Sequence, residues 1–184
     1  MGRTARGARV FHLYLDTSAL VANYVVESGT EVVERALEDA YTARASEIAY
    51  PEARSAFARL HREGAIGEDF LRTLVGWLDE DFDRSVYAPL PADAGVCKLA
   101  GRLAERHALR AYDAVQLATA LHLRANYRPD PAGDIVYFLT FDQRLRRAAE
   151  AEERLRVYEP PAENDGGGTP RGNRGNAPRG RERW

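Results

Sequence analysis

Two short apolar segments, one near each end of the chain, are each followed directly by an aspartate. Residues 10–15 form a strand-like apolar run that ends at Asp16, and residues 135–141 form a second run that ends at Asp142. A helix-like segment follows each aspartate, which predicts two units of a parallel sheet with helical crossovers. Ligands of such sheets bind outside the carboxyl ends of the strands. We therefore expect both aspartates to face one cleft, where a bound cation would balance their charge.

Strand-like and helix-like segments alternate along the rest of the chain. Helices are expected at residues 19–26, 28–41, 46–63, 67–83, 91–106, 111–126 and 143–153, and strands at residues 10–15, 43–46, 85–90, 135–141 and 155–158. Ser28 and Glu31 have the spacing of a capping box, and Ser46 is a candidate N-cap for the helix that follows it, although Pro51 also allows the first turn of that helix to begin at Tyr50. This alternation predicts an α/β fold, a three-layer sandwich with a mainly parallel central sheet.

The 184-residue chain is long enough for one domain with a sizeable core. We expect an N-terminal extension at residues 1–9, the folded domain at residues 10–159 and a disordered tail at residues 160–184, which is rich in Gly, Pro and Arg. Residues 162–184 contain five Arg and three acidic residues, a net charge of +2, so the remainder carries −4. An acidic body is not typical of a groove built only for phosphate backbones, but it suits carboxylates that hold a metal.

The cysteine content and the hydropathy exclude several classes of protein. Cys97 is the only cysteine of the sequence, which excludes an internal disulfide and a cysteine-based zinc site and fits the reducing cytoplasm. No apolar run approaches the roughly 20 residues that span a bilayer. The first apolar segment is interrupted by His12 and ends at Asp16, unlike a signal peptide. We expect a cytoplasmic protein without a membrane partner.

Two more carboxylates are expected within apolar helix faces. Residues four positions apart share a helix face, which places Glu52 in the row of positions 48, 52, 56 and 60. Asp113 begins the row of positions 113, 117 and 121. Burying a carboxylate without a partner costs several kcal/mol, so both residues need an explanation.

Each of the four acidic residues has an ordinary structural interpretation as well. Asp16 and Asp142 fit helix N-caps, Asp113 fits a first helical turn, where the helix dipole favours negative charge, and Glu52 fits an ion pair with an arginine. All four together are harder to explain in this way. Two carboxylates about 4 Å apart repel by roughly 4 kcal/mol at an effective dielectric constant of about 20. A hard divalent cation, Mg²⁺ or Mn²⁺, relieves this repulsion and binds oxygen ligands.

Four stretches of the chain resemble, in the same order, the motifs of the PIN domain, and above all those of the VapC-type toxins of bacterial toxin–antitoxin pairs. They are residues 14–20, 50–54, 109–114 and 139–145, and the resemblance extends over about residues 10–158. It implies a metal-dependent endoribonuclease on a parallel-sheet sandwich, which is usually a homodimer and is held inactive by a cognate antitoxin.

The resemblance also implies how the acidic residues act on RNA. Asp16 and Asp113 would hold one or two Mg²⁺ or Mn²⁺ ions, and Glu52 and Asp142 would complete the site directly or through water. A water activated in this site would then attack a phosphodiester. The hydroxyl groups of Thr17, Ser18 and Thr140 are expected to hydrogen-bond to the carboxylates or to the metal-bound waters and so fix their positions.

Two further functions fit the same residues. The first is a PIN nuclease of RNA processing or turnover that has no antitoxin. The second is a PIN-fold RNA-binding protein without catalysis, which is less favoured because none of the four acidic residues is lost. A short upstream gene that encodes a DNA-binding antitoxin would distinguish the toxin from the processing nuclease.

Overall fold

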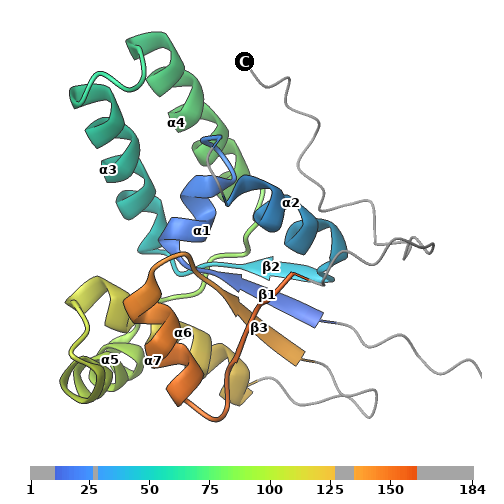
Figure 1. Ribbon diagram of the computed structural model, residues 1–184, viewed down its shortest axis with the longest axis vertical. Helices are drawn as coiled ribbons and strands as arrows, with labels where there is room; N and C mark the ends of the chain where they lie inside the picture. The colour runs from blue at the N-terminus through green and yellow to red at the C-terminus, as the bar shows by residue number, and fades with distance from the viewer. Residues whose placement is uncertain (1–10, 27–28, 127–134, 161–184) are drawn as a thin grey trace, which may run out of the picture.

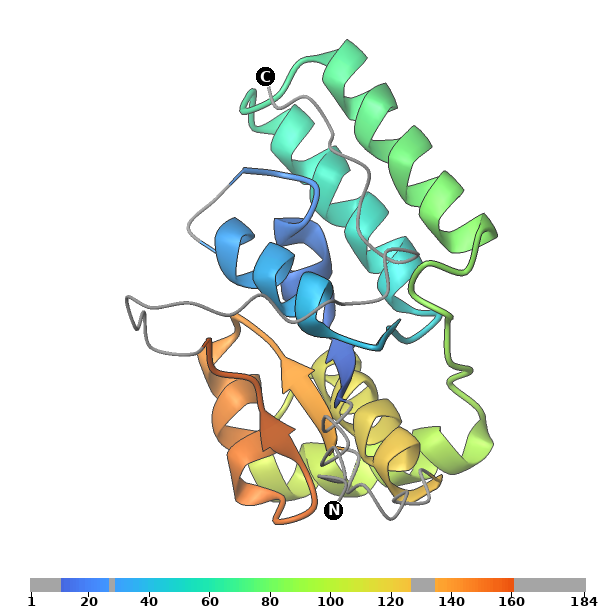
Figure 2. The same ribbon diagram turned by 90° about the vertical axis from the view of Figure 1, so that its right-hand side faces the viewer.

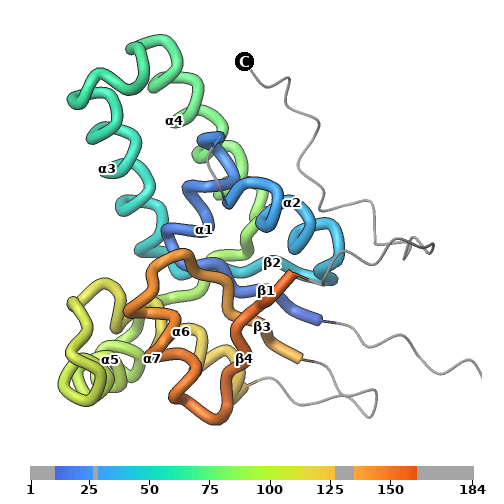
Figure 3. Tube along the Cα trace, in the orientation of Figure 1, coloured from blue at the N-terminus to red at the C-terminus, as the bar shows by residue number. Residues whose placement is uncertain are grey.

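The central sheet places the ends of two distant segments side by side. The computed structural model describes residues 11–26, 29–126 and 135–160. Its strands are β1 (Phe11–Leu15), β2 (Thr42–Arg44), β3 (Ile135–Leu139) and β4 (Arg156–Val157). They form one sheet in the order β2-β1-β3-β4, in which every neighbouring pair is parallel (Figures 1 and 3). Leu15 lies opposite Leu139, so Asp16 and Thr140 both follow at the same edge of the sheet.

Helices cover both faces of this sheet. They are α1 (Thr17–Ala22), α2 (Thr30–Asp39), α3 (Ala49–Arg62), α4 (Glu68–Asp83), α5 (Ala94–His107), α6 (Ala111–Asn126) and α7 (Gln143–Ala151). Helices α1 and α2 lie on one side of the sheet, and α5, α6 and α7 lie on the other (Figures 1 and 2). Helices α3 and α4 form a hairpin that extends beyond the sheet next to α1 (Figure 1). The predicted three-layer α/β sandwich is therefore confirmed.

Side chains of β1 alternate between two hydrophobic cores, as the pleat of a strand requires. Leu13 and Leu15 are buried in the core that also contains Phe57 of α3. Tyr14 points to the opposite face and is buried in the core that contains Leu117 of α6. This central strand therefore has buried side chains on both faces, as is typical of a parallel sheet covered by helices.

The predicted strand at residues 85–90 is wrong. Ser85 and Ala88 have positive φ angles of 55° and 31°, and the segment turns away from the end of α4. Its apolar character comes from Tyr87, which is buried in the core that also contains residues of α3 and α4, and whose carbonyl accepts a hydrogen bond from the backbone nitrogen of Ala45. Leu90 alone makes a parallel bridge, to Ser46. This bridge also holds Ser46 outside the helix, so the prediction that Ser46 is an N-cap is wrong, and α3 begins after Ile48.

Several predicted boundaries also differ from the structure. Helix α1 ends at Ala22 rather than near residue 26, and a turn follows it. Helix α2 begins after Gly29, which makes no side-chain cap; Ser28, the predicted cap, lies outside the described residues. The predicted extension at residues 1–9 and nearly all of the predicted tail lie outside them too. Among the described helices, none has both the length and the apolar character needed to cross a membrane.

Candidate active site

Asp16 lies at the carboxyl end of β1 and is buried, with only 4% of its surface exposed. Its Oδ1 accepts hydrogen bonds from the backbone nitrogen of Ala19 at 2.9 Å and from the Ser18 hydroxyl at 2.7 Å. Its Oδ2 accepts one from the Thr140 hydroxyl at 2.8 Å. Asp16 is therefore the N-cap of α1. Burial nevertheless outweighs these three hydrogen bonds and raises the pKa of the carboxyl group to about 6.

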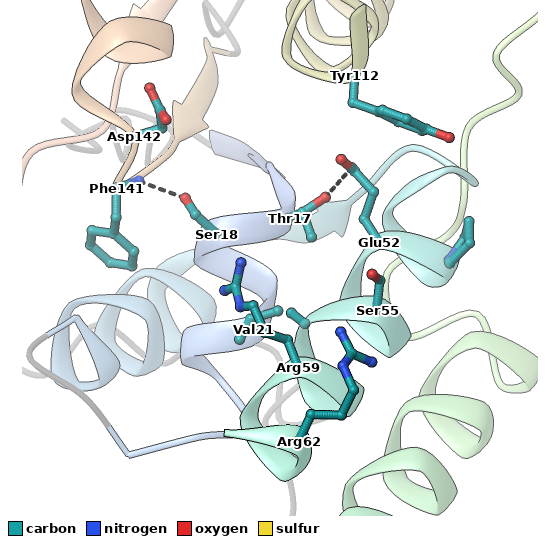
Figure 4. A pocket seen from close by; sticks show the side chains of 12 residues that line it. Thr17, Ser18, Val21, Glu52, Ser55, Arg59, Arg62, Tyr112, Phe141 and Asp142 are labelled. Carbon is teal, nitrogen blue, oxygen red and sulfur yellow. Dashed lines mark hydrogen bonds between the residues drawn. The ribbon is translucent and has the colours of Figure 1, made fainter. Parts of the chain in front are cut away.

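The hydroxyls of Ser18 and Thr140 connect Asp16 to the end of β3. The Ser18 hydroxyl accepts a hydrogen bond from the backbone nitrogen of Phe141 at 2.8 Å (Figure 4). The Thr140 hydroxyl accepts one from the backbone nitrogen of Asp142 at 3.1 Å. The same two hydroxyls donate to the two oxygens of Asp16. The position of this carboxylate is thus fixed by both strand–helix junctions that the sequence singled out.

Asp142 is exposed, and it caps α7 in the same way that Asp16 caps α1. Its Oδ1 accepts hydrogen bonds from the backbone nitrogens of Arg144 and Leu145, both at 2.8 Å. This arrangement uses only one carboxylate oxygen. Among the described residues, no hydrogen bond is made to the other oxygen, Oδ2. Asp142 therefore combines the structural role of an N-cap with a position at the cleft described below.

Glu52 lies on α3, and its carboxylate accepts hydrogen bonds from side chains of α1 and α6. Its Oε2 accepts hydrogen bonds from the Thr17 hydroxyl at 2.5 Å and from the Gln116 side-chain nitrogen at 2.8 Å (Figure 4 shows the first). The prediction that Glu52 lies in the middle of the buried face of its helix is wrong. That face is formed by Ala49, Ala53 and Phe57, and Glu52 lies at its edge, half-buried.

Asp113 is half-buried in the first turn of α6. Burial is the main cause of its raised pKa, and the negative charges of Asp142 and Glu52 add to the rise, while Arg110 opposes it. The charge of Glu52 also adds to the rise that burial causes in the pKa of Asp16. The four carboxylates are therefore close enough to interact, although they come from four parts of the chain.

The donor set fits a hard divalent cation in its chemistry, because every candidate ligand is a carboxylate or hydroxyl oxygen and the carboxylates oppose each other's charge. It does not form a compact cluster. Within the described part of the chain, no group of three or more Asp, Glu, His or Cys side chains is arranged to hold a metal ion. The carboxylates of Asp16 and Glu52 instead accept hydrogen bonds from protein donors. Asp113 lies close enough to Asp142 and Glu52 for their charges to raise its pKa.

A cleft of about 700 Å³ opens beside these carboxylates. Its lining brings together residues of α1, α3, α6 and the β3–α7 junction (Figure 4). Thr17, Ser18, Glu52 and Asp142 lie on one part of the wall, and Arg59 and Arg62 lie further along α3. The cleft therefore combines acidic and hydroxyl groups at one end with positive charge at the other.

Sequence reasoning missed several residues of this region. Gln116 is a polar residue within the buried stretch of α6, three positions after Asp113, and that spacing alone would have placed both on one face. Arg59 and Arg62 follow Glu52 at intervals of two to three helical turns on α3. Tyr112 precedes Asp113 and is 58% exposed. Neither its exposure nor its place at the cleft has a sequence signal.

Comparison with known proteins agrees with this geometry. The family model of the PIN domain matches residues 13–151. Two curated relatives from Mycobacterium tuberculosis are each 34% identical over 140 residues, which cover 76% of this chain and 90% of the relative. They are ribonuclease VapC45 of strain CDC 1551 / Oshkosh and ribonuclease VapC49 of strain ATCC 25618 / H37Rv. The chain belongs to the PIN-domain family, in its VapC-type branch, as the resemblance of the four motifs predicted.

Proposed function

We propose that this protein is a divalent-metal-dependent endoribonuclease and acts as the toxin of a toxin–antitoxin pair. The observation that carries the proposal is a group of four mutually repelling carboxylates: Glu52 and Asp142 line the cleft. The charge of Glu52 acts on Asp16, and the charges of Glu52 and Asp142 act on Asp113. The chain is a PIN-domain protein, and its relatives from Mycobacterium tuberculosis are ribonucleases. These findings support a hydrolase that acts on RNA.

In this proposal the four acidic residues form the catalytic site. Asp16 and Asp113 bind the metal, and Glu52 and Asp142 complete the site directly or through water. Bound Mg²⁺ or Mn²⁺ would supply an activated water and offset charge on the leaving oxygen. The protein contributes fixed carboxylate positions: the hydroxyls of Ser18 and Thr140 hold both oxygens of Asp16. Such pre-organisation matters because a small misplacement of a reacting group costs much of the rate.

The wall of the cleft provides groups that suit an RNA strand. Arg59 and Arg62 line it, and neither forms an ion pair with an acidic residue of the described chain. Guanidinium groups bind phosphate oxygens with two parallel hydrogen bonds. Tyr112 lies exposed at the same cleft, next to Glu52 (Figure 4). Exposed aromatic rings stack on unpaired bases, so this combination supports single-stranded RNA as the substrate.

The partners follow from the same proposal. We infer a cognate antitoxin, a homodimer and action in the cytoplasm, in agreement with the VapC-type relatives and the single, exposed cysteine. A carboxylate-rich cleft can be blocked by an Arg or Lys from a partner segment, which would pair with the acids and displace the metal. Expression of this chain alone should then inhibit growth, and expression with the antitoxin gene should restore growth and yield a complex of both proteins.

The decisive experiment combines cleavage with expression. The purified protein should cleave RNA in the presence of Mg²⁺ or Mn²⁺, and cleavage should stop when a chelator is added. Mapping of the RNA ends would give the cleavage sites. Chelator-resistant activity that follows the protein through purification would overturn the metal-dependent mechanism. RNA cleavage without growth inhibition, and with no small partner recovered, would instead favour the processing nuclease. A protein that binds RNA under all these conditions but leaves it intact would favour the non-catalytic alternative.

A further inference from the structure

We propose that Gln116 is a positioning residue that fixes the Glu52 carboxylate for catalysis, through a buried hydrogen-bond chain that begins at Tyr14. The inference rests on the proposed function, because it takes Glu52 as a member of the catalytic site. It adds two residues to the four acidic residues of that site.

The chain of hydrogen bonds crosses four elements of the fold. Tyr14 of β1 is fully buried, and its hydroxyl donates to Gln116 Oε1 at 2.8 Å. Gln116 of α6 is 2% exposed, and its Nε2 donates to Thr17 Oγ1 of α1 and to Glu52 Oε2 of α3, both at 2.8 Å. The Thr17 hydroxyl also donates to the same oxygen of Glu52. Residues far apart in the sequence thus meet at one carboxylate oxygen.

The chemistry of the groups fixes the orientation of the Gln116 amide. The Glu52 carboxylate only accepts hydrogen bonds, so the amide nitrogen must face it, and the amide oxygen must then face Tyr14. Both N–H groups of the amide are used, one toward Thr17 and one toward Glu52. A flipped amide would place its oxygen against the carboxylate and lose these two bonds. The Glu52 carboxylate therefore sets the orientation of the amide, and the Tyr14 hydroxyl donates to the amide oxygen and anchors it in that orientation.

The arrangement also separates the two oxygens of Glu52. Oε2 accepts both protein donors, whereas no residue of the described chain donates a hydrogen bond to Oε1. Glu52 lines the cleft, so Oε1 is the oxygen left for a metal or for a water in the site. Neighbours of Gln116 on α6, such as Ala114 and Leu117, are buried in the core. In such surroundings hydrogen bonds are stronger and the amide has few alternative partners.

A purely structural role is the competing interpretation, in which Gln116 serves only to satisfy the Tyr14 hydroxyl. The structural role and the positioning role predict different outcomes when Tyr14 and Gln116 are replaced together. Removing one partner leaves a buried polar group unsatisfied and destabilises the fold, whereas replacing both by apolar groups of similar shape is nearly neutral. A structural role predicts full recovery in the double variant, but a positioning role predicts recovery of stability alone.

The test uses the full chain and three variants, with Tyr24→Phe as the matched control. Tyr24 is also a buried tyrosine, and its hydroxyl donates to Asp81 Oδ2 at 2.7 Å, away from the cleft. Gln116→Met, Tyr14→Phe and the double variant Tyr14→Phe/Gln116→Met are measured for melting temperature, for Mn²⁺ affinity by titration without RNA, and for kcat and KM with RNA.

We expect Gln116→Met to weaken Mn²⁺ binding and to lower kcat by about 10-fold to 100-fold, as is typical when a group that orients a metal ligand is lost. KM for RNA should change little, because Gln116 is buried and does not contact the substrate. The double variant should regain the melting temperature that Gln116→Met loses, but neither the Mn²⁺ affinity nor kcat. Tyr24→Phe should lower the melting temperature and leave Mn²⁺ affinity and kcat unchanged.

Wild-type Mn²⁺ affinity and kcat in Gln116→Met would overturn the positioning role, as would their full recovery in the double variant. If Gln116→Met does not fold, the double variant decides, because it also removes the buried Tyr14 hydroxyl, while the Thr17 hydroxyl still donates to Glu52. Failure of the proposed function looks different. In that case the wild-type protein and Tyr24→Phe do not cleave RNA at all, and only the melting temperatures follow the network.

Discussion

Asp16 and Asp93 accept the same N-cap hydrogen bond, which the backbone nitrogen three residues later donates to the side-chain Oδ1 at 2.9 Å in both. Their environments differ. The hydrogen bond from Val96 is the main cause of a lowered pKa at Asp93, which is exposed at the start of α5. Burial raises the pKa of Asp16 to about 6 in spite of the same bond. Asp93 is therefore an ordinary N-cap, whereas Asp16 is an N-cap whose ionised form is destabilised by burial.

This pair provides a matched test of the catalytic role. Asp16→Asn should abolish RNA cleavage and leave the fold intact, because asparagine also caps helices well. Asp93→Asn makes the same chemical change at the same helix position and should cleave like wild type. Asp113→Asn should also abolish cleavage, measured as initial rates with Mg²⁺. Activity of Asp16→Asn near that of Asp93→Asn would show that Asp16 has only its structural role.

The raised pKa of Asp16 predicts how the stability of the metal-free protein depends on pH. The folded state binds the proton more tightly than the unfolded state, where the ordinary value is 3.8. The contribution of Asp16 to stability is therefore greatest below about pH 4, falls as pH rises toward 6, and levels off above it. The rise of the pKa of Asp16 from 3.8 to about 6 corresponds to a loss of roughly 3 kcal/mol in the free energy of unfolding between low and high pH.

Urea unfolding with chelator, at pH 4.5 and at pH 7.5, measures this effect as the difference between wild type and Asp16→Asn. The difference isolates Asp16 from other groups that titrate in the same range. Asp16→Asn should be the more stable protein at pH 7.5, and its advantage should shrink at pH 4.5. An advantage that is equal at both pH values would contradict the burial argument.

Arg59 and Arg62 should contribute to RNA affinity mainly by binding phosphate groups. In an Asp113→Asn background, which keeps the RNA intact, Arg59→Ala or Arg62→Ala should weaken RNA binding. The slope of log affinity against log salt should fall by about 0.7 for each phosphate of a single strand that is no longer neutralised. Fluorescence anisotropy at several salt concentrations measures both quantities. Arg72→Ala is the control, because Arg72 pairs with Glu68 and Asp69 on α4, and an equally large effect there would indicate nonspecific charge effects.

The sequence predicted the parts of the site that depend on local patterns. The sequence indicated the two strands that precede Asp16 and Asp142, and their parallel pairing places both carboxyl ends at one edge of the sheet, although β3 ends at Leu139, before Asp142. Both also proved to be N-caps, so the structural and the catalytic interpretations do not exclude each other. Glu52 was expected to be more buried than it is, because a helical row identifies a face but does not say how far the neighbouring helix covers it.

The parts that the sequence could not provide depend on contacts between distant elements. The bond from Gln116 to Glu52 joins α6 to α3, and only the packing of the fold around α1 brings the two residues together. The apolar segment around Tyr87 resembles a strand in composition, but the positive φ angles of Ser85 and Ala88 turn it into the core instead. Composition could not distinguish burial within a turn from burial within a sheet.

Gly29, the N-cap of α2, lies directly against the ring of Phe141, which follows β3. A Cβ added at Gly29 would lie 2.5 Å from two carbons of the Phe141 ring, a distance at which something must shift. Phe141 lines the cleft and directly precedes Asp142. Its backbone nitrogen also donates to the Ser18 hydroxyl, which in turn holds Asp16. A displaced ring would therefore disturb both the wall of the cleft and the contacts behind the catalytic carboxylates.

Gly29→Ala should therefore impair RNA cleavage although Gly29 contacts none of the four acidic residues. We expect kcat/KM to fall by roughly 10-fold, about 1.4 kcal/mol of transition-state stabilisation, with a lower melting temperature as the ring is forced to move. Gly67→Ala is the matched control. Gly67 is also a helix N-cap, but a Cβ there meets nothing within 4 Å. Trimming the ring in Gly29→Ala/Phe141→Leu should recover part of the melting temperature. A fully active, fully stable Gly29→Ala would show that the Phe141 ring moves aside without consequence for the site.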